Sequence, residues 1–141
     1  MYVARSSSSR RIMSIDLGIG SRLPAYCTSM GRVLLAQLPP AELGAYLRRV
    51  KLIALTNRTE ISRDKLTAMF ATIRAKGYTV VDQELEIGLR SIAVPVADPG
   101  GRIAAALNVS TQAARVSVAE MEKNFLVPLR AAARDLGMLL G

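Results

Sequence analysis

The feature that most constrains the fold is a pair of apolar segments separated by a short turn sequence. Residues 91–97 read SIAVPVA, residues 102–110 read RIAAALNVS, and the residues between them are DPGG. Aspartate, proline and paired glycines favour the backbone angles of a tight reversal. Two apolar segments flanking such a turn predict an antiparallel β-hairpin.

The predicted hairpin has two chemically different faces, because side chains alternate along a strand. The bulky face carries Ile92, Val94, Val96, Ile103, Ala105, Leu107 and Val109. The other face carries Ser91, Ala93, Pro95, Ala97, Ala104, Ala106, Asn108 and Ser110. We expect the small faces to lie on the same side and to leave a recess that suits a small polar ligand. The alternative is that the small residues let a helix approach closely, with Asn108 and Ser110 at the frayed end of the strand.

Helical periodicity and boundary residues predict four helices. They are expected from near Met30 to before Pro39, from Pro40, from the Ser62 cap to Gly77, and from Ser117 onward. The last begins with the capping box SVAE and should be kinked by Pro128. Its expected apolar stripe comprises Met121, Phe125, Leu129, Ala132, Leu136 and Leu139 or Leu140.

Three further short strands are expected over residues 2–6, 11–15 and 78–82. With the hairpin and the helices, they predict the α+β class, in which helices pack on one antiparallel sheet. The length of 141 residues suits a single domain.

The composition argues against several classes of site. The chain has no histidine and one cysteine, so a Ser-His-Asp triad, a Cys-His dyad and nearly every zinc pattern are excluded. We expect no metal and no cofactor. The net charge of +8 favours anionic partners, but the arginines are scattered and aromatic residues are scarce. We therefore expect a solvated basic surface. The lone cysteine fits the cytoplasm, and no apolar run is long enough for a membrane span.

The entrance of the first helix is a candidate anion site. Residues 22–31 read RLPAYCTSMG, so small and polar residues directly precede an apolar helix. The first N–H groups of a helix lack partners within it and lie at the positive end of its dipole. A carboxylate could bind the N–H groups of Ser29, Met30 and Gly31. The alternative is a plainly capped helix, with Thr28 or Ser29 as the cap.

Residues 82–90, DQELEIGLR, place three carboxylates close together. They are compatible with a metal or acid–base site, but an exposed polar connector is the favoured interpretation. Arg90 is a candidate to clamp a ligand carboxylate or to pair with Glu84 or Glu86.

Several stretches resemble the effector-binding domain of IclR-type bacterial transcriptional regulators. These are RLPAYCTSMGRVLLAQLP, LTNRT, IRAKGYTVVDQELEIGLRSIAVPV and GGRIAAALNVSTQAAR. The sequences of these stretches are most similar to the Pca and Pob branch, whose members control the protocatechuate and 4-hydroxybenzoate routes of the β-ketoadipate pathway. The resemblance covers nearly the whole chain, with its motifs in the order of the family.

The resemblance implies a GAF- or profilin-like fold, with a curved antiparallel sheet flanked by helices. It also implies a pocket between the sheet and the segment that leads into the first helix. The polar part of that pocket would comprise the backbone at Ser29 and Met30 with Ser91, Asn108 and Ser110. The apolar wall would comprise Ile12, Ile15, Leu23 and Leu89. Some members place an acidic group near Val81, for which the neighbouring Asp82 is a substitute here.

Residues 1–141 are accordingly expected to form one effector-binding domain. We expect this chain to lack the family's winged helix-turn-helix and the first elements of the domain. We therefore expect contact with DNA only through that absent winged helix-turn-helix. The resemblance further implies a homo-oligomer, a dimer or a tetramer.

The sequence thus predicts a sensing and oligomerisation domain, not an enzyme. The expected ligand is a small carboxylate of aromatic catabolism, such as protocatechuate, 4-hydroxybenzoate or β-ketoadipate, with Arg22 or Arg90 as countercharge. The alternative is a structural oligomerisation module without a functional pocket. A hydrolase that uses Cys27 or Ser29 would lack a base.

Overall fold

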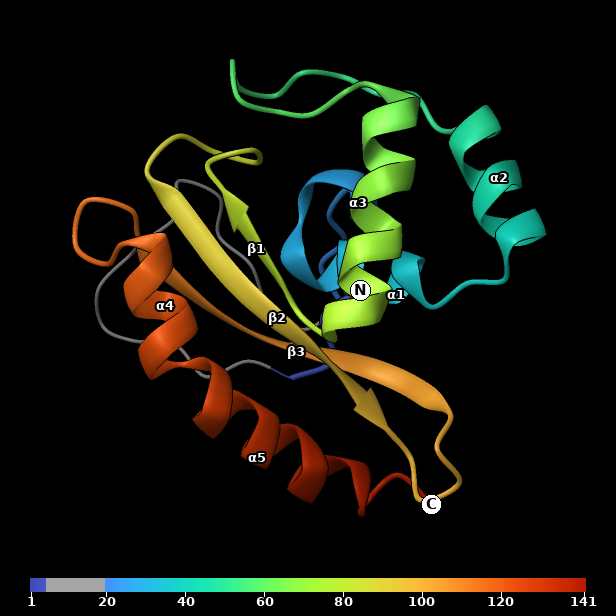
Figure 1. The fold of residues 1–141 in the computed structure, drawn as a ribbon, viewed down its shortest axis with the longest axis vertical. Helices are drawn as coiled ribbons and strands as arrows, with labels where there is room; N and C mark the ends of the chain where they lie inside the picture. Colours follow the sequence, from blue (N-terminus) through green and yellow to red (C-terminus); the bar gives the residue numbers. More distant parts are fainter. Residues whose placement is uncertain (5–19) are drawn as a thin grey trace.

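The predicted hairpin is the centre of the molecule (Figure 1), which we describe for residues 1–4 and 20–141 from a computed structural model. Strand β2 (Leu89–Ala97) pairs antiparallel with β3 (Ile103–Gln112) on one side. On its other side β2 pairs antiparallel with β1 (Thr79–Asp82). The strand order is β1-β2-β3. The predicted α+β class is confirmed.

The residues DPGG form the predicted tight turn between β2 and β3. Asp98 Oδ1 accepts hydrogen bonds from the N–H groups of Gly100 and Arg102, both at 3.0 Å. Gly101 has a φ of 86°, in the left-handed region that favours glycine.

The small faces of the two hairpin strands lie on the same side of the sheet, as predicted. Ser91 pairs with Ser110 and Ala93 with Asn108. A helix covers part of this face, because α1 (Ser29–Ala36) packs into the core that contains Ala93. The two interpretations of the small face therefore apply to different parts of it. Ala93 and Ala106 let α1 pack closely, and Ser91, Asn108 and Ser110 line a space that α1 leaves uncovered.

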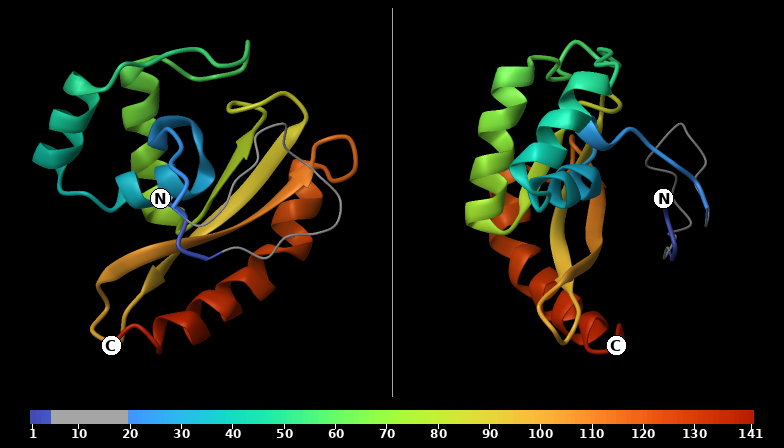
Figure 2. Two further views of the ribbon diagram at one scale, coloured as in Figure 1. Left: turned by 180° about the vertical axis from the view of Figure 1, so that it is seen from behind. Right: turned by 90° about the vertical axis from the view of Figure 1, so that its right-hand side faces the viewer.

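The helices lie on both sides of the strands (Figure 1). Helix α3 (Arg63–Lys76) packs on α1, and α2 (Pro40–Arg49) lies farther from the strands (Figure 2). On the opposite face, α4 (Val118–Asn124) and α5 (Leu126–Gly137) pack against the bulky side chains of β2. The domain thus has a core on each face of the sheet.

The helix boundaries agree closely with the predicted ones. Ser62 Oγ accepts the N–H of Lys65 at 3.3 Å, and Gly77 ends α3 with a φ of 76°. The capping box of Ser117 and Glu120 is formed in both directions. These caps satisfy helix-end groups that would otherwise lack partners.

The prediction for the last helix was wrong in part. Pro128 divides it into α4 and α5 at Phe125, because proline cannot donate the hydrogen bond that would continue the first helix. The buried face of α5 comprises Leu129, Ala133 and Gly137. Of the expected stripe, Ala132, Leu136, Leu139 and Leu140 are exposed.

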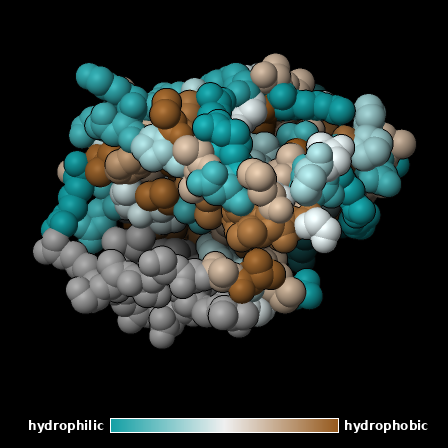
Figure 3. Space-filling model, turned by 90° about the horizontal axis from the view of Figure 1, so that it is seen from below, coloured by the Kyte–Doolittle hydropathy of each residue, from teal (hydrophilic) through white to brown (hydrophobic). Residues whose placement is uncertain are grey.

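Glycine at position 137 is required by close packing. A Cβ there would lie 2.1 Å from the backbone oxygen of Ala97. The side chains that follow Gly137 face solvent, since Met138 and Leu139 are 77% and 80% exposed. Figure 3 views the molecule from below, relative to Figure 1, and shows hydrophobic side chains among hydrophilic ones on this side.

Across the described ranges, no helix has the length and hydropathy needed to cross a bilayer.

Residues 2–4, the described part of the strand expected over residues 2–6, form no strand. Tyr2 instead donates its N–H to Ser21 O at 3.0 Å and accepts the N–H of Gly20 at 2.8 Å. The other residues of that strand and the strand expected over 11–15 lie outside the described residues.

Candidate ligand-binding site

A cavity of about 90 Å³ lies where the small face of the sheet meets the N-terminal end of α1. The two candidate sites from the sequence, the helix entrance and the hairpin recess, thus face the same cavity. The described residues that line it are Met1, Tyr2, Leu23, Cys27, Thr28, Ser29, Met30, Gly31, Leu34, Val81, Leu85, Leu89, Ser91, Asn108 and Ser110.

The polar floor of the cavity follows from the strand register. Ser91 and Ser110 are directly opposite, and Asn108 is on the same face of β3. Asn108 Nδ2 donates to Ser110 Oγ at 3.3 Å. Ser91 Oγ donates to Ser29 Oγ at 2.8 Å, which ties the sheet to α1. Two hydroxyls and an amide therefore face the helix entrance across a short space.

The helix entrance supplies backbone donors. Helix α1 begins at Ser29, and the Thr28 hydroxyl donates to Pro24 O at 2.9 Å instead of capping the helix. The leading N–H groups of α1 are therefore directed to the cavity end of the helix. Gly31 has a packing role that the sequence did not indicate. A Cβ there would lie 2.4 Å from Ala25 Cα, so glycine lets the preceding turn η1 (Ala25–Cys27) pack on the helix.

The apolar wall contains both described residues of the predicted set, Leu23 and Leu89. Ile12 and Ile15 lie outside the described residues. Val81, which the resemblance placed near the pocket, lines the cavity, and the lining residues Met1, Tyr2, Leu34 and Leu85 were not predicted from the sequence. Strand alternation and pairing with Ser91 place Val81 on the small face.

Asp82 does not line the cavity. It pairs with Arg90 across the sheet, one position away from the pair of Val81 and Ser91, and so lies on the other face. Partial burial acts to raise the pKa of Asp82, but hydrogen bonds from Arg90 and Gln83 and the charge of Arg58 hold that pKa below its ordinary value. Its ion pairs with Arg90 and Arg58 are both 2.9 Å long.

Neither arginine proposed as a countercharge reaches the cavity. Arg90 is engaged by Asp82 and by the backbone oxygens of Ala113 and Val116. Arg22 is exposed and is not a lining residue. Within the described ranges, the side chains that line the cavity carry no charge.

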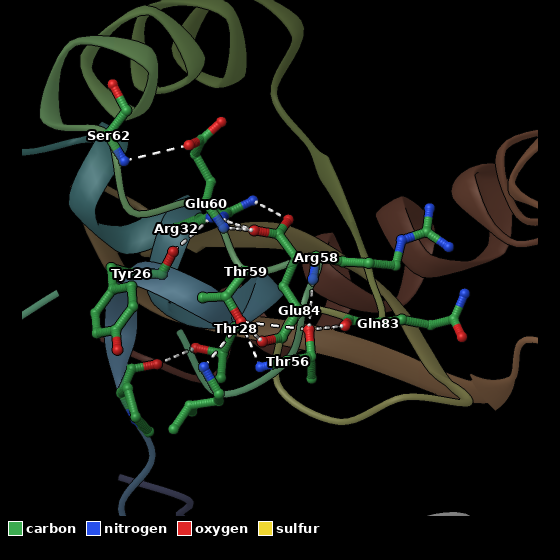
Figure 4. A network of polar contacts seen from close by, with 12 residues as sticks. Tyr26, Thr28, Arg32, Thr56, Arg58, Thr59, Glu60, Ser62, Gln83 and Glu84 are labelled. Atoms are coloured by element: carbon green, nitrogen blue, oxygen red, sulfur yellow. Dashed lines mark hydrogen bonds and ion pairs between the residues drawn. The ribbon is translucent and has the colours of Figure 1, made fainter. Parts of the chain in front are cut away.

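The expectation of an exposed connector was wrong for Glu84. Its side chain is 11% exposed and that of Arg32 is 3% exposed. Two hydrogen bonds of 2.8 and 2.6 Å join the guanidinium and the carboxylate in a bidentate pair (Figure 4). The described residues include no group of acidic and cysteine side chains arranged to bind a metal ion.

Thr59 and Glu60 bond directly to Glu84, beside this ion pair (Figure 4). Thr59 Oγ1 donates to Glu84 O at 2.6 Å, and the N–H of Glu60 donates to Glu84 Oε1 at 2.8 Å. Thr56 Oγ1 donates to Gln83 O at 2.7 Å. The motif LTNRT thus serves to hold the connector between β1 and β2.

Cys27 is fully buried at the cavity wall, and burial raises the pKa of its thiol from 9.0 to about 11, although the positive charge of Arg32 opposes this effect. At pH 8 we expect slow reaction of the folded protein with an aromatic disulfide reagent and fast reaction in urea, because the thiolate is the nucleophile. Equally fast reaction of the folded protein would contradict the assignment.

The same pKa shift predicts a pH dependence of stability. As the pH rises from about 9 to about 11, the unfolded chain loses the thiol proton and the folded chain keeps it. The free energy of unfolding therefore falls over this range, and Cys27→Ser should reduce the slope.

Comparison with known proteins identifies a family to which the chain is similar. The family model described as bacterial transcriptional regulator IclR C-terminal matches residues 1–138. The Pca regulon regulatory protein of Pseudomonas putida is 54% identical over 136 residues, which cover 96% of this chain and 47% of the relative. The p-hydroxybenzoate hydroxylase transcriptional activator of Acinetobacter baylyi is 32% identical, over 92% of this chain and 48% of the relative.

A solved structure is similar as well. It is the inducer-binding domain of the PobR transcription factor from Acinetobacter, a double mutant in complex with 3-hydroxybenzoic acid. The TM-score is 0.82 at 33% identity, covering 86% of this chain and 71% of that one. This chain spans about half the length of the curated relatives that it matches. The family model covers nearly the whole chain and the relatives agree with it, so the chain belongs to the IclR family of bacterial transcriptional regulators, as their C-terminal effector-binding domain.

Proposed function

We propose that this domain senses a small carboxylate of aromatic catabolism, either a hydroxylated aromatic acid or a β-ketoadipate-type dicarboxylate. The observation that carries the proposal is the convergence of two donor sets on one cavity. The uncharged polar floor on the sheet faces the first N–H groups of α1. Such a site suits a compact anion that also carries hydroxyl or keto groups.

Each group has a proposed role. The N–H groups of Ser29 and Met30 bind the carboxylate, because they lie at the positive end of the α1 dipole. Ser91, Asn108 and Ser110 form hydrogen bonds with the rest of the ligand. Leu23 and Leu89 contact its apolar body. Asp82 is left out, because it lies on the other face of the sheet.

The relatives support this ligand class. The PobR domain was solved with 3-hydroxybenzoic acid, and two relatives are named for the Pca regulon and for p-hydroxybenzoate hydroxylase. In the whole regulator, we infer that ligand binding favours one arrangement of a cytoplasmic homo-oligomer, a dimer or a tetramer. That arrangement would then bias DNA binding by a winged helix-turn-helix.

A thermal-shift titration tests the proposal. The panel comprises 3-hydroxybenzoate, 4-hydroxybenzoate, protocatechuate and β-ketoadipate. An acid that binds only the folded state should stabilise it by about 2.7 kcal/mol at a hundredfold excess over its Kd. The matched control is the amide of the responding acid, which keeps the shape but lacks the negative charge and should give a much smaller shift.

The outcome separates the two functional interpretations. A shift with one acid, but not with its amide, supports a carboxylate sensor. Cooperative melting without a shift from any acid contradicts the proposal and favours the structural oligomerisation module.

A further inference from the structure

The Arg32–Glu84 pair lies directly behind the cavity without lining it. Arg32 follows Ser29 by three residues, so the two lie on the same side of α1. Glu84 directly precedes Leu85 in the connector. Ser29 and Leu85 both line the cavity, whereas the ion pair does not. A bond between Arg32 and Glu84 therefore links two separate parts of the cavity wall.

Further hydrogen bonds give the pair a single geometry. Arg32 Nε donates to Tyr26 O at 2.7 Å, next to the lining residue Cys27. The Glu84 carboxylate also accepts the N–H of Glu60 at 2.8 Å. The guanidinium thus joins η1, α1 and the connector, and each partner is hydrogen-bonded on more than one side. Charge-assisted bidentate bonds of this kind restrict orientation as well as distance.

The connector that carries Leu85 needs such support. Gln83 begins it with a φ of 61°, a left-handed conformation that is uncommon for residues other than glycine, and Gly88 near its end has a φ of 90°. Gln83 Oε1 accepts the N–H of Gly88 at 3.0 Å. The hydroxyls of Thr56 and Thr59 hold the connector from its other side, through the hydrogen bonds to Gln83 O and Glu84 O described above. The segment has little regular structure, so its position depends on these side-chain bonds.

We propose that Arg32 and Glu84 act as a positioning pair for the carboxylate cavity, holding the N-terminal end of α1 at a set distance from the connector. This inference rests on the proposed function. A buried ion pair often adds little stability compared with apolar residues of similar size, because both charges lose their hydration. Its directional geometry is what an apolar contact would not supply. The pair should therefore affect ligand affinity beyond its effect on folding.

The test is a double-mutant cycle in ligand affinity. Arg32→Lys keeps the charge but loses the planar fork, and Glu84→Gln keeps the shape but loses the charge. Isothermal titration calorimetry gives the Kd of the acid with the largest shift in the panel, at a temperature where every variant is folded. Each single variant should bind about tenfold more weakly, and the double variant should be no weaker than about the poorer single one.

The matched control is Leu129→Ala, in the core on the other face of the sheet. It should lower the melting temperature and leave the Kd within about twofold, since Leu129 does not line the cavity. Wild-type affinity in both folded single variants would overturn the proposal, as would additive losses or an equal loss in Leu129→Ala. If no acid binds the wild-type chain, the proposed function fails first, and this inference with it.

Discussion

Replacing Arg32 with methionine is expected to lower the free energy of unfolding by about 3–5 kcal/mol, because it leaves a buried carboxylate without its partner. The Glu84 side chain is 11% exposed and receives two bonds from the guanidinium. Methionine has a similar length but no donor. A loss of this size is a large part of the ~5–15 kcal/mol that holds a typical domain folded.

The control is the double variant Arg32→Met with Glu84→Gln. The amide carries no charge, and its oxygen can still accept the N–H of Glu60 that Glu84 accepts at 2.8 Å. The double variant should therefore recover much of the loss, because the unpaired charge dominates it. Urea unfolding at pH 7 measures all three proteins. Equal losses in the single and the double variant would show that the charge is not the cause.

The parts of the fold that depend on neighbouring residues could be predicted from the sequence. The DPGG turn, the Ser62 cap, Gly77 and the Ser117 capping box act over a few residues, and all were found as expected. The shared direction of the small faces follows from alternation and a short turn, so the polar floor of the cavity was predictable too.

The ion pair was missed because its partners are 52 residues apart in the sequence. Nothing in the connector alone distinguishes Glu84 from an exposed carboxylate. A signal was present in α1, however. The buried residues Ser29, Arg32, Val33 and Ala36 follow helical spacing, which places an arginine on the buried face. A charge in that position requires a buried partner, and the carboxylates of residues 82–86 were one group of candidates.

The error in the last helix has a different cause. A periodic stripe assumes one continuous helix, but the break at Phe125 changes the phase between α4 and α5. Within α5 the expected stripe continued from Leu129 to Ala132 and Leu136, but the helix buries its small residues Ala133 and Gly137 instead, and Leu136 is 39% exposed. Proline in the interior of a helical pattern should have divided the prediction into two helices.

Replacing Ser110 with leucine is expected to weaken binding of the responding acid by about a hundredfold, while the domain stays folded. Ser110 lines a cavity of only about 90 Å³, opposite Ser91. The larger side chain would occupy the ligand's space and remove the hydroxyl that accepts the Asn108 amide at 3.3 Å. Because it fills an existing cavity, it should change the free energy of unfolding by no more than ~1.5 kcal/mol.

Two further variants make this result specific. Ser110→Ala removes the hydroxyl without filling the cavity and should weaken binding by roughly tenfold, the effect of one lost hydrogen bond. Val109→Leu adds bulk one position away, on the other face of β3, where Val109 is 36% exposed, and should leave the Kd unchanged. Calorimetric titration of all three with the same acid ranks them. If Ser110→Leu bound that acid as tightly as the wild-type chain, the acid would have to bind outside this cavity, and the roles given to Ser29, Met30, Ser91 and Asn108 would fall with it.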